Sequence, residues 1–457
     1  MEIDRRAWVA FGLGLLLALA PLSTLNGDPL DSPSPLPLPR GERGRREGEA
    51  AALASIHNEQ ASHLALLGVD RWQHTGYRGQ GIKIAILDTG FRGYRDQLGK
   101  TLPTRVVTRC FRDDGNFEAK NSQHGILCAE AVHALAPDAE LLLVTWEPDS
   151  SERFLEAVRW AKDAGARIIS CSILMPSWSD GEGGGDFHQK LRQILQGSDE
   201  GALRSASRLN SSQSSETLFF ACAGNTAQRH WMGAFHAGTD GFHEWQPGQT
   251  VNNLRPWSSE RVSVELYGRN ATHYEITVRD EKGEEVSRSK ALFGISGPSI
   301  AARFTPDSQS TYQVRVRLKQ GKPGSFHLAA LGGTLSTVTS QGSVACPADG
   351  PEVIAIGAVT STGRRLDYSS CGQESHSLKP DFVAPVPFPT TVRSQAFTGT
   401  SAAAPQAAAL AAVLWSRHPQ WTGQQVRAGL VQFAHDVGRP GPDCETGYGM
   451  IALPDTP

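Results

Sequence analysis

The chain has 457 residues, of which 44 are basic and 47 are acidic. That length suffices for a large core and for more than one compact unit. The near balance of charge argues against a broad positive surface for nucleic acid, and no polybasic patch points to a membrane surface. Glycine (47) and proline (27) are both abundant, which is typical of a loop-rich enzyme or of a β-rich module.

The N-terminus predicts export. Arg5 and Arg6 precede an apolar stretch, Ala7–Leu22, which at about 16 residues is short for a membrane span of roughly 20. We interpret residues 1–27 as a signal peptide, with an uncleaved N-terminal anchor as the alternative. The protein is therefore expected to be secreted or held in the cell envelope, with a membrane as partner only if the segment is uncleaved. Residues 28–50, Pro-rich and then charged, are expected to form a disordered linker or a short propeptide.

The chain carries seven cysteines: Cys110, Cys128, Cys171, Cys222, Cys346, Cys371 and Cys444. In an exported protein this number predicts a disulfide or two, and an odd count leaves at least one free thiol in a monomer. No CxxC pair or Cys/His cluster has zinc spacing, so the sequence gives no reason to expect a cysteine-bound metal.

After residue 51 the sequence alternates between helical and strand patterns. Apolar residues recur at helical spacing from about Ala51, and again from Ser151, a predicted N-cap, to Ala164. Short apolar runs predict buried parallel strands at 82–87, 140–144, 167–172 and 217–221. Alternating strands and helices imply a parallel sheet that is covered on both faces.

A period-two pattern replaces the helical one between residues 231 and 335. Apolar residues alternate with polar ones around Val264, Ile276 and Val314. Asp280–Gly283 and Gly321–Gly324 have the composition of hairpin turns. We therefore predict an inserted antiparallel β-sandwich, after which the α/β pattern resumes with the strand at 353–359.

Three polar residues lie at the ends or starts of predicted strands and helices. Asp88 follows the strand at 82–87, at the edge of a parallel sheet where ligands gather. His124 opens a helix that Pro137 ends, and Asn225 lies in a Gly-Asn turn after a strand. Each is also explained by ordinary turn or surface chemistry, so none is diagnostic alone.

The segment around Ser401 is more specific. Phe397–Pro405 reads FTGTSAAAP and leads into an Ala-rich helix. A serine at a helix N-terminus lies among backbone N–H groups that favour a developing negative charge. Gly399 permits a tight turn before the serine, and Pro405 is expected in the first helical turn.

In the order Asp, His, Asn, Ser, these segments resemble the subtilisin-like serine peptidases, over about 67–226 and 337–453. Lys379–Pro385 resembles the strand that precedes the nucleophile in that family. The resemblance implies a three-layer α/β fold with a mostly parallel sheet. It also implies a catalytic triad of Asp88, His124 and Ser401. Asn225 is then expected in an oxyanion hole.

The resemblance further implies a polypeptide substrate and chemistry that requires no cofactor, and it leaves structural calcium open. The catalytic domain is then split into 51–230 and 336–457, with 231–335 as the insert. The expected substrate-binding segments are Ser172-Ile173-Leu174 and Ala223-Gly224. Leu174 stands where the family commonly has glycine, so side-chain preference is not carried over.

Two alternatives remain at this stage. The chain could be a catalytically inactive member that serves as a binding or scaffold protein, or the β insert could make it chiefly a binding module. A Gly-x-Ser-x-Gly esterase is disfavoured, because its triad has the order Ser, Asp, His. Cys128 lies four residues after His124 on the same predicted helix, so we expect its thiol to be buried beside the imidazole.

Overall fold

The computed structural model describes residues 40–197, 217–292, 299–373 and 378–457. The predicted signal peptide or anchor, residues 1–27, lies outside the described residues. Among the residues that are described, no helix is long and apolar enough to cross a membrane.

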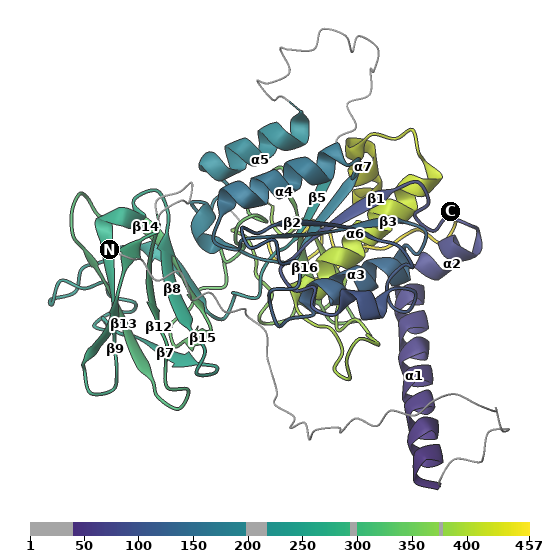
Figure 1. The fold of residues 1–457 in the computed structure, drawn as a ribbon. Coiled ribbons are helices and arrows are strands. Elements are labelled where there is room, and N and C mark those ends of the chain that lie inside the picture. Colours follow the sequence, from purple (N-terminus) through teal and green to yellow (C-terminus); the bar gives the residue numbers. More distant parts are fainter. Residues whose placement is uncertain (1–39, 198–216, 293–298, 374–377) are drawn as a thin grey trace.

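A seven-stranded parallel sheet forms the centre of the larger part of the molecule (Figure 1). Its order is β17-β16-β5-β4-β1-β3-β2, and the pairing of Leu87 with both Val144 and Cys171 aligns the carboxyl ends of the neighbouring strands β4, β1 and β3. The strands are β1 (Lys83–Leu87), β2 (Val107–Phe111), β3 (Glu140–Trp146), β4 (Ile168–Cys171), β5 (Leu218–Cys222), β16 (Ile354–Val359) and β17 (Phe382–Pro385).

Helices cover both faces of this sheet, which confirms the predicted three-layer α/β fold. One apolar core joins one sheet face to α2 (Val69–His74), α3 (His124–Leu135), α6 (Thr400–Arg417) and α7 (Gly423–Phe433). A second core joins the opposite face to α4 (Ser151–Asp163) and α5 (Asp186–Gln196). Short 3₁₀ turns are η1 (Tyr94–Gln97) and η2 (Pro176–Trp178).

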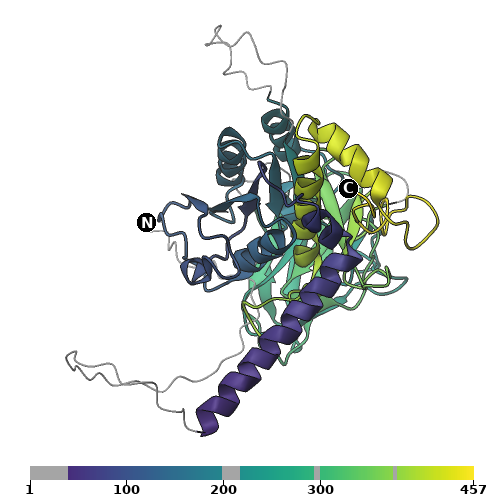
Figure 2. The ribbon, with the colours of Figure 1, turned by 90° about the vertical axis from the view of Figure 1, so that its right-hand side faces the viewer.

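Helix α1 (Arg40–Leu66) extends away from the body, which it contacts near its C-terminal end (Figure 2). There His63 Nε2 lies 2.7 Å from Gln406 Oε1 on α6. The expected disorder of residues 28–50 is therefore wrong for the part from Arg40 onward. The predicted cap of α4 is also displaced, because Ser150 rather than Ser151 accepts the N–H of Arg153.

In the described residues, ten strands form the predicted antiparallel β-sandwich beside the parallel sheet (Figure 1). One sheet has the order β10-β9-β13-β7-β15 and the other β11-β12-β8-β14-β6, with an apolar core between them. The bounds are β6 (His230–Ala234), β7 (Asn252–Pro256), β8 (Val262–Tyr267), β9 (Tyr274–Arg279), β10 (Glu285–Arg288), β11 (Lys290–Ala291), β12 (Ser299–Phe304), β13 (Tyr312–Leu318), β14 (Ser325–Leu331) and β15 (Gly333–Leu335), with η4 (Ala271–His273) before β9.

One of the two expected hairpin turns is correct. Asp280–Gly283 joins the antiparallel pair β9 and β10, and Gly283 has the positive φ of 80° that such a turn requires. Gly321–Gly324 instead connects β13 of one sheet to β14 of the other. Composition identified a turn at both places, but it could not tell a hairpin from a crossing between sheets.

The expected disulfides are absent from the structure. All seven cysteines lie in the described part of the chain, and no disulfide joins any two of them. Six of the seven are buried, and only Cys110 is partly exposed. Cys128, Cys171, Cys222 and Cys346 belong to the two apolar cores of the parallel sheet, a packing role that the cysteine count could not distinguish from cross-linking.

A buried ion pair fixes the start of β17, the strand that precedes α6. Lys379 and Asp381 are 4% and 2% exposed, and Lys379 Nζ lies 2.8 Å from Asp381 Oδ2. The same carboxylate accepts the N–H of Ala355 on β16 and contacts Arg427 of α7. One side chain therefore joins two strands and a helix.

Replacement of Asp381 by Asn should lower the free energy of unfolding by about 3–5 kcal/mol, because it leaves the Lys379 ammonium buried beside a neutral amide. Denaturant unfolding measures the change. Asp138→Asn is a matched control, since its pair with Arg78 is about 40% exposed at both ends and should contribute only about 0–1 kcal/mol. Equal losses in the two variants would contradict this account.

Candidate active site

Asp88 and His124 meet above the carboxyl end of β1. Asp88 is the first residue after β1, His124 is the first residue of α3, and His124 Nδ1 lies 2.7 Å from Asp88 Oδ2. The other carboxylate oxygen accepts the backbone N–H groups of Thr89 and Gly90 at 2.8 and 2.9 Å. The Asp88 side chain is 1% exposed and that of His124 is 26% exposed, so a buried, fixed carboxylate orients a ring that solvent still reaches.

Two opposing effects set the protonation of His124. Burial disfavours the imidazolium, but the Asp88 carboxylate, which also accepts its hydrogen bond, and the nearby Cys128 sulfur outweigh burial. The pKa of His124 is therefore raised well above its ordinary value of 6.5. The pair stabilises a positive charge on the ring, which is the charge that the ring acquires when it takes up a proton.

Glycine at position 125 allows this close approach. A Cβ atom there would lie 2.5 Å from the ring of Phe91 and 2.8 Å from Asp88 Cβ, too close for either to stay in place. The N–H of Gly125 donates instead to the carbonyl of Gly90 at 2.7 Å, which ties the first turn of α3 to the loop after β1.

Ser401 is the second residue of α6 and exchanges two hydrogen bonds with Ser172. Its hydroxyl donates to the Ser172 carbonyl at 3.2 Å, and the Ser172 hydroxyl donates to the Ser401 carbonyl at 3.0 Å. The Ser401 carbonyl is available because its usual helical partner would be the N–H of residue 405, which is proline. Pro405 thus lies in the second turn of α6, not in the first as expected.

Cys128 lies beside His124, as the helical spacing predicted, and it also contacts the Ser401 segment. Its sulfur is buried, 4.0 Å from His124 Nδ1, 3.9 Å from Asp88 Oδ2 and 3.7 Å from the Ser401 carbonyl oxygen. A single small side chain therefore touches the aspartate–histidine pair and the serine residue.

The side-chain amide of Asn225 is held by its oxygen. Asn225 Oδ1 accepts the backbone N–H of Thr400 at 2.9 Å and its hydroxyl at 3.0 Å. Gly399 has a φ of 91°, and a Cβ there would lie 2.9 Å from Asn225 Nδ2. The N–H₂ group is thereby directed to the start of α6, where the first backbone N–H groups have no partner within the helix.

The five predicted substrate-binding residues come together. Ser172, Ile173 and Leu174 follow β4, whereas Ala223 and Gly224 follow the adjacent strand β5, and β4 pairs with β5 through Cys171 and Ala221. A Cβ on Gly224 would lie 3.3 Å from Leu174 Cδ2, so the two segments are in contact. Their binding role is a prediction that rests on the family resemblance.

Two further residues, Tyr368 and Arg229, make contacts at this site that the sequence did not predict. The Tyr368 hydroxyl accepts the N–H of Gly399 at 3.2 Å and lies 3.2 Å from Thr398 Oγ1. Arg229 donates to the backbone carbonyl of Asn225 at 2.9 Å, and its guanidinium lies 4.6 Å from the ring centre of Trp257, which is 54% exposed. Burial lowers the pKa of Arg229 to about 10. No local motif marks these residues, although Arg229 lies only four residues after Asn225.

Several known proteins resemble this chain. The subtilisin amylosacchariticus of Bacillus subtilis subsp. amylosacchariticus is 37% identical over 111 residues, which are 24% of this chain and 29% of that protein. The subtilisin of Bacillus pumilus is also 37% identical over 111 residues, 40% of its length. The chain thus spans less than half of either subtilisin.

The solved structure of the Clostridium perfringens CspB protease superposes with a TM-score of 0.59 at 16% identity, covering 86% of this chain and 95% of that one, a likeness of fold. The sequence model of the subtilase family matches residues 79–273 and 287–449, well over half of the 457 residues. The chain belongs to the subtilase family.

Proposed function

We propose that this protein is a serine endopeptidase that cleaves polypeptides through an acyl-enzyme, with Ser401 as nucleophile, His124 as general base and acid, and Asp88 as the orienting carboxylate. The supporting observation is that Cys128 contacts both the Asp88–His124 pair and the Ser401 carbonyl in the first turn of α6. Family membership supports the same assignment.

In the proposed reaction, the Ser401 hydroxyl turns from the Ser172 carbonyl toward the imidazole. His124 takes the proton as the serine oxygen attacks the peptide carbonyl carbon, and then gives that proton to the leaving amine. Water repeats the sequence on the acyl-enzyme and restores the free hydroxyl. Hydrogen bonds of this kind are often long in the unliganded enzyme and shorten when substrate binds.

The tetrahedral intermediate carries its negative charge on the former carbonyl oxygen. We assign its stabilisation to Asn225 Nδ2 and the backbone N–H of Ser401. The Asn225 amide oxygen is already engaged by Thr400, so its N–H₂ group is oriented before substrate arrives. No cofactor is required by this chemistry.

We further propose that residues 51–230 and 336–457 form the catalytic domain, that 231–335 is an accessory module, and that the protein is exported. The alternative, an inactive binding or scaffold protein, requires a defect in the chemical groups. Asp88, His124, Asn225 and Ser401 are all present, and the short contact between Asp88 and His124 argues for an active enzyme.

Ser401→Ala should abolish cleavage of a denatured protein and labelling by a fluorophosphonate probe, while thermal unfolding stays within a few degrees of wild type. Asn225→Ala should lower kcat by about 10²–10³-fold with little change in KM, the magnitude known for the corresponding amide in a subtilisin. Cleavage by Ser401→Ala at near the wild-type rate would exclude the proposed nucleophile, and no labelling of folded wild type would favour the scaffold alternative.

The activity should rise with pH through the raised pKa of His124. The ring must be neutral to accept the serine proton, so kcat/KM falls as the pH drops below that pKa, which lies above 6.5. Asp88→Asn removes the stabilising charge, so it should move the acid limb to lower pH and reduce kcat by about 10⁴-fold. In the control Asp138→Asn, at a surface pair, the limb should not move; if it moves equally, Asp88 does not set the pKa.

Mercurials should inhibit this serine peptidase through Cys128. A bulky group on that sulfur would displace His124, and a shift of about 1 Å can reduce the rate by roughly 10²-fold. Cys128→Ala should retain activity and lose most of the sensitivity, whereas Cys110→Ala should stay sensitive. Undiminished inhibition of Cys128→Ala would assign the effect to another cysteine.

A further inference from the structure

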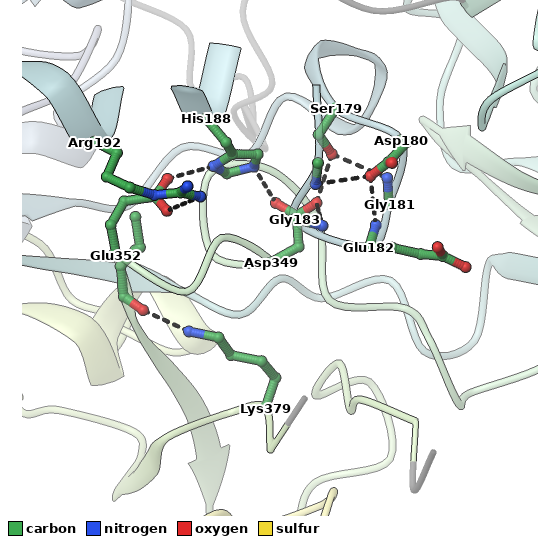
Figure 3. A network of polar contacts seen from close by, with 12 residues as sticks. Ser179, Asp180, Gly181, Glu182, Gly183, His188, Arg192, Asp349, Glu352 and Lys379 are labelled. Atoms are coloured by element: carbon green, nitrogen blue, oxygen red, sulfur yellow. Dashed lines mark hydrogen bonds and ion pairs between the residues drawn. The ribbon is translucent and has the colours of Figure 1, made fainter. Parts of the chain in front are cut away.

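A second group of buried polar side chains lies outside the proposed active site (Figure 3). His188 comes from α5, whereas Cys346, Asp349 and Glu352 come from the segment between the β-sandwich and β16. His188 is 1% exposed, Asp349 5% and Cys346 0%. None of these residues has a role in the reaction proposed above.

Three donor atoms of different chemistry converge in this group. His188 Nε2 lies 2.9 Å from Asp349 Oδ1. One imidazole nitrogen, the Cys346 sulfur and one Asp349 oxygen all lie within 4.8 Å of one another. Ligands bound to Zn²⁺ at about 2.0–2.3 Å in a tetrahedron are separated by roughly 3.3–3.6 Å. Opening the imidazole–carboxylate contact by about 0.5 Å would therefore admit the ion.

Hydrogen bonds from neighbouring groups hold the imidazole and the carboxylate in place, as is usual for the ligands of a metal ion. His188 Nδ1 lies 2.6 Å from Glu352 Oε1, so a carboxylate can fix the ring with Nε2 directed at the metal. The second oxygen of Asp349 accepts the Ser179 hydroxyl at 2.5 Å and the N–H of Gly183 at 3.1 Å. Figure 3 shows Glu352 on one side of the imidazole and Asp349 on the other.

We propose that His188 Nε2, Cys346 Sγ and Asp349 Oδ1 bind a Zn²⁺ ion. A thiolate, an imidazole and a carboxylate suit zinc, whereas calcium and magnesium prefer sets of oxygen atoms. A water molecule would complete the tetrahedron, and a cavity of about 30 Å³, lined by Asp349 with Gly181, Gly342 and Lys379, lies beside the carboxylate ligand.

Charge is conserved when the ion binds. Zn²⁺ replaces two protons, the one between His188 Nε2 and Asp349 and the one on the Cys346 thiol, and both are released to solvent. Two positive charges replace two positive charges, so the buried group has the same net charge before and after. This balance removes the large penalty that an uncompensated buried ion would carry.

The site would fasten the β-sandwich to the parallel sheet. Cys346 and Asp349 belong to the chain that returns from the sandwich, and the Ser179–Gly183 loop supports Asp349. That loop also touches the sandwich, since a Cβ on Gly181 would lie 2.9 Å from the rings of both His327 and Tyr267. Zinc would join these segments to α5, which makes it a structural ion.

The full chain with Ser401→Ala should be purified, stripped with a chelator and titrated with Co²⁺, a spectroscopic probe for tetrahedral zinc sites. One equivalent should bind with a thiolate-to-cobalt charge-transfer band, and Zn²⁺ should displace it. Calorimetry in two buffers of different ionisation enthalpy should show release of about two protons per zinc. The Ser401→Ala background makes the result independent of the proposed function.

Single substitutions test which residues bind the ion. Cys346→Ser should abolish the band, and Glu352→Gln should weaken zinc binding by about 10–100-fold, because Glu352 would act on the ion by orienting His188 and not as a ligand. Cys128→Ser should keep the band. Loss of the band in Cys128→Ser with retention in Cys346→Ser would move the ion to the Asp88–His124 pair and overturn the proposal. Failure of the folded chain to bind one equivalent would overturn it as well, and would leave His188 as a metal-free imidazolium between two carboxylates.

Discussion

The burial of helix α6 is the constraint on which the site depends. Between Thr400 and Trp415 every residue except Ser401 is buried, so the helix must run through the core with small side chains in its first turns. Pro405 leaves the Ser401 carbonyl without its helical donor, and Ser172 and Cys128 take that place. Because proline has no N–H group, the Ser401 carbonyl instead contacts Ser172, which follows β4, and Cys128, which lies on α3.

The β-sandwich is coupled to the same site through Arg229. This residue immediately precedes β6, donates to the main chain of Asn225 and lies over Trp257 at the end of β7. Arg229 thus joins the sandwich to the backbone of the residue proposed to bind the oxyanion. Trp257 is 54% exposed, so the sandwich presents an aromatic ring to solvent beside this contact.

The sequence was sufficient wherever one local pattern determines one structure. Asp88, His124, Asn225 and Ser401 each lie at the end or start of a predicted element, and a parallel sheet brings such ends to one edge. The sequence could not predict contacts between segments that lie far apart in the chain. The contacts of Arg229 with Trp257 and of Cys346 with His188 follow no characteristic sequence spacing. The two predicted hairpin turns, Asp280–Gly283 and Gly321–Gly324, show the same limit, because their composition specifies a reversal of the chain and not the strand that follows. The cysteine count wrongly predicted disulfides, because a sequence does not distinguish a buried free thiol from a cysteine in a disulfide.

The two histidine clusters use similar groups for different purposes. His124 and His188 each lie beside an aspartate and a cysteine, and in each case the carboxylate is also held by backbone N–H donation. His124 is 26% exposed and has its Nδ1 on Asp88, so its other nitrogen can meet a substrate. His188 is 1% exposed and has Asp349 and Glu352 on its two nitrogens. The two rings thus differ in exposure and in the number of carboxylates that they contact. His124 can exchange protons, which suits proton transfer, whereas His188 is fixed in place, which suits a structural ion.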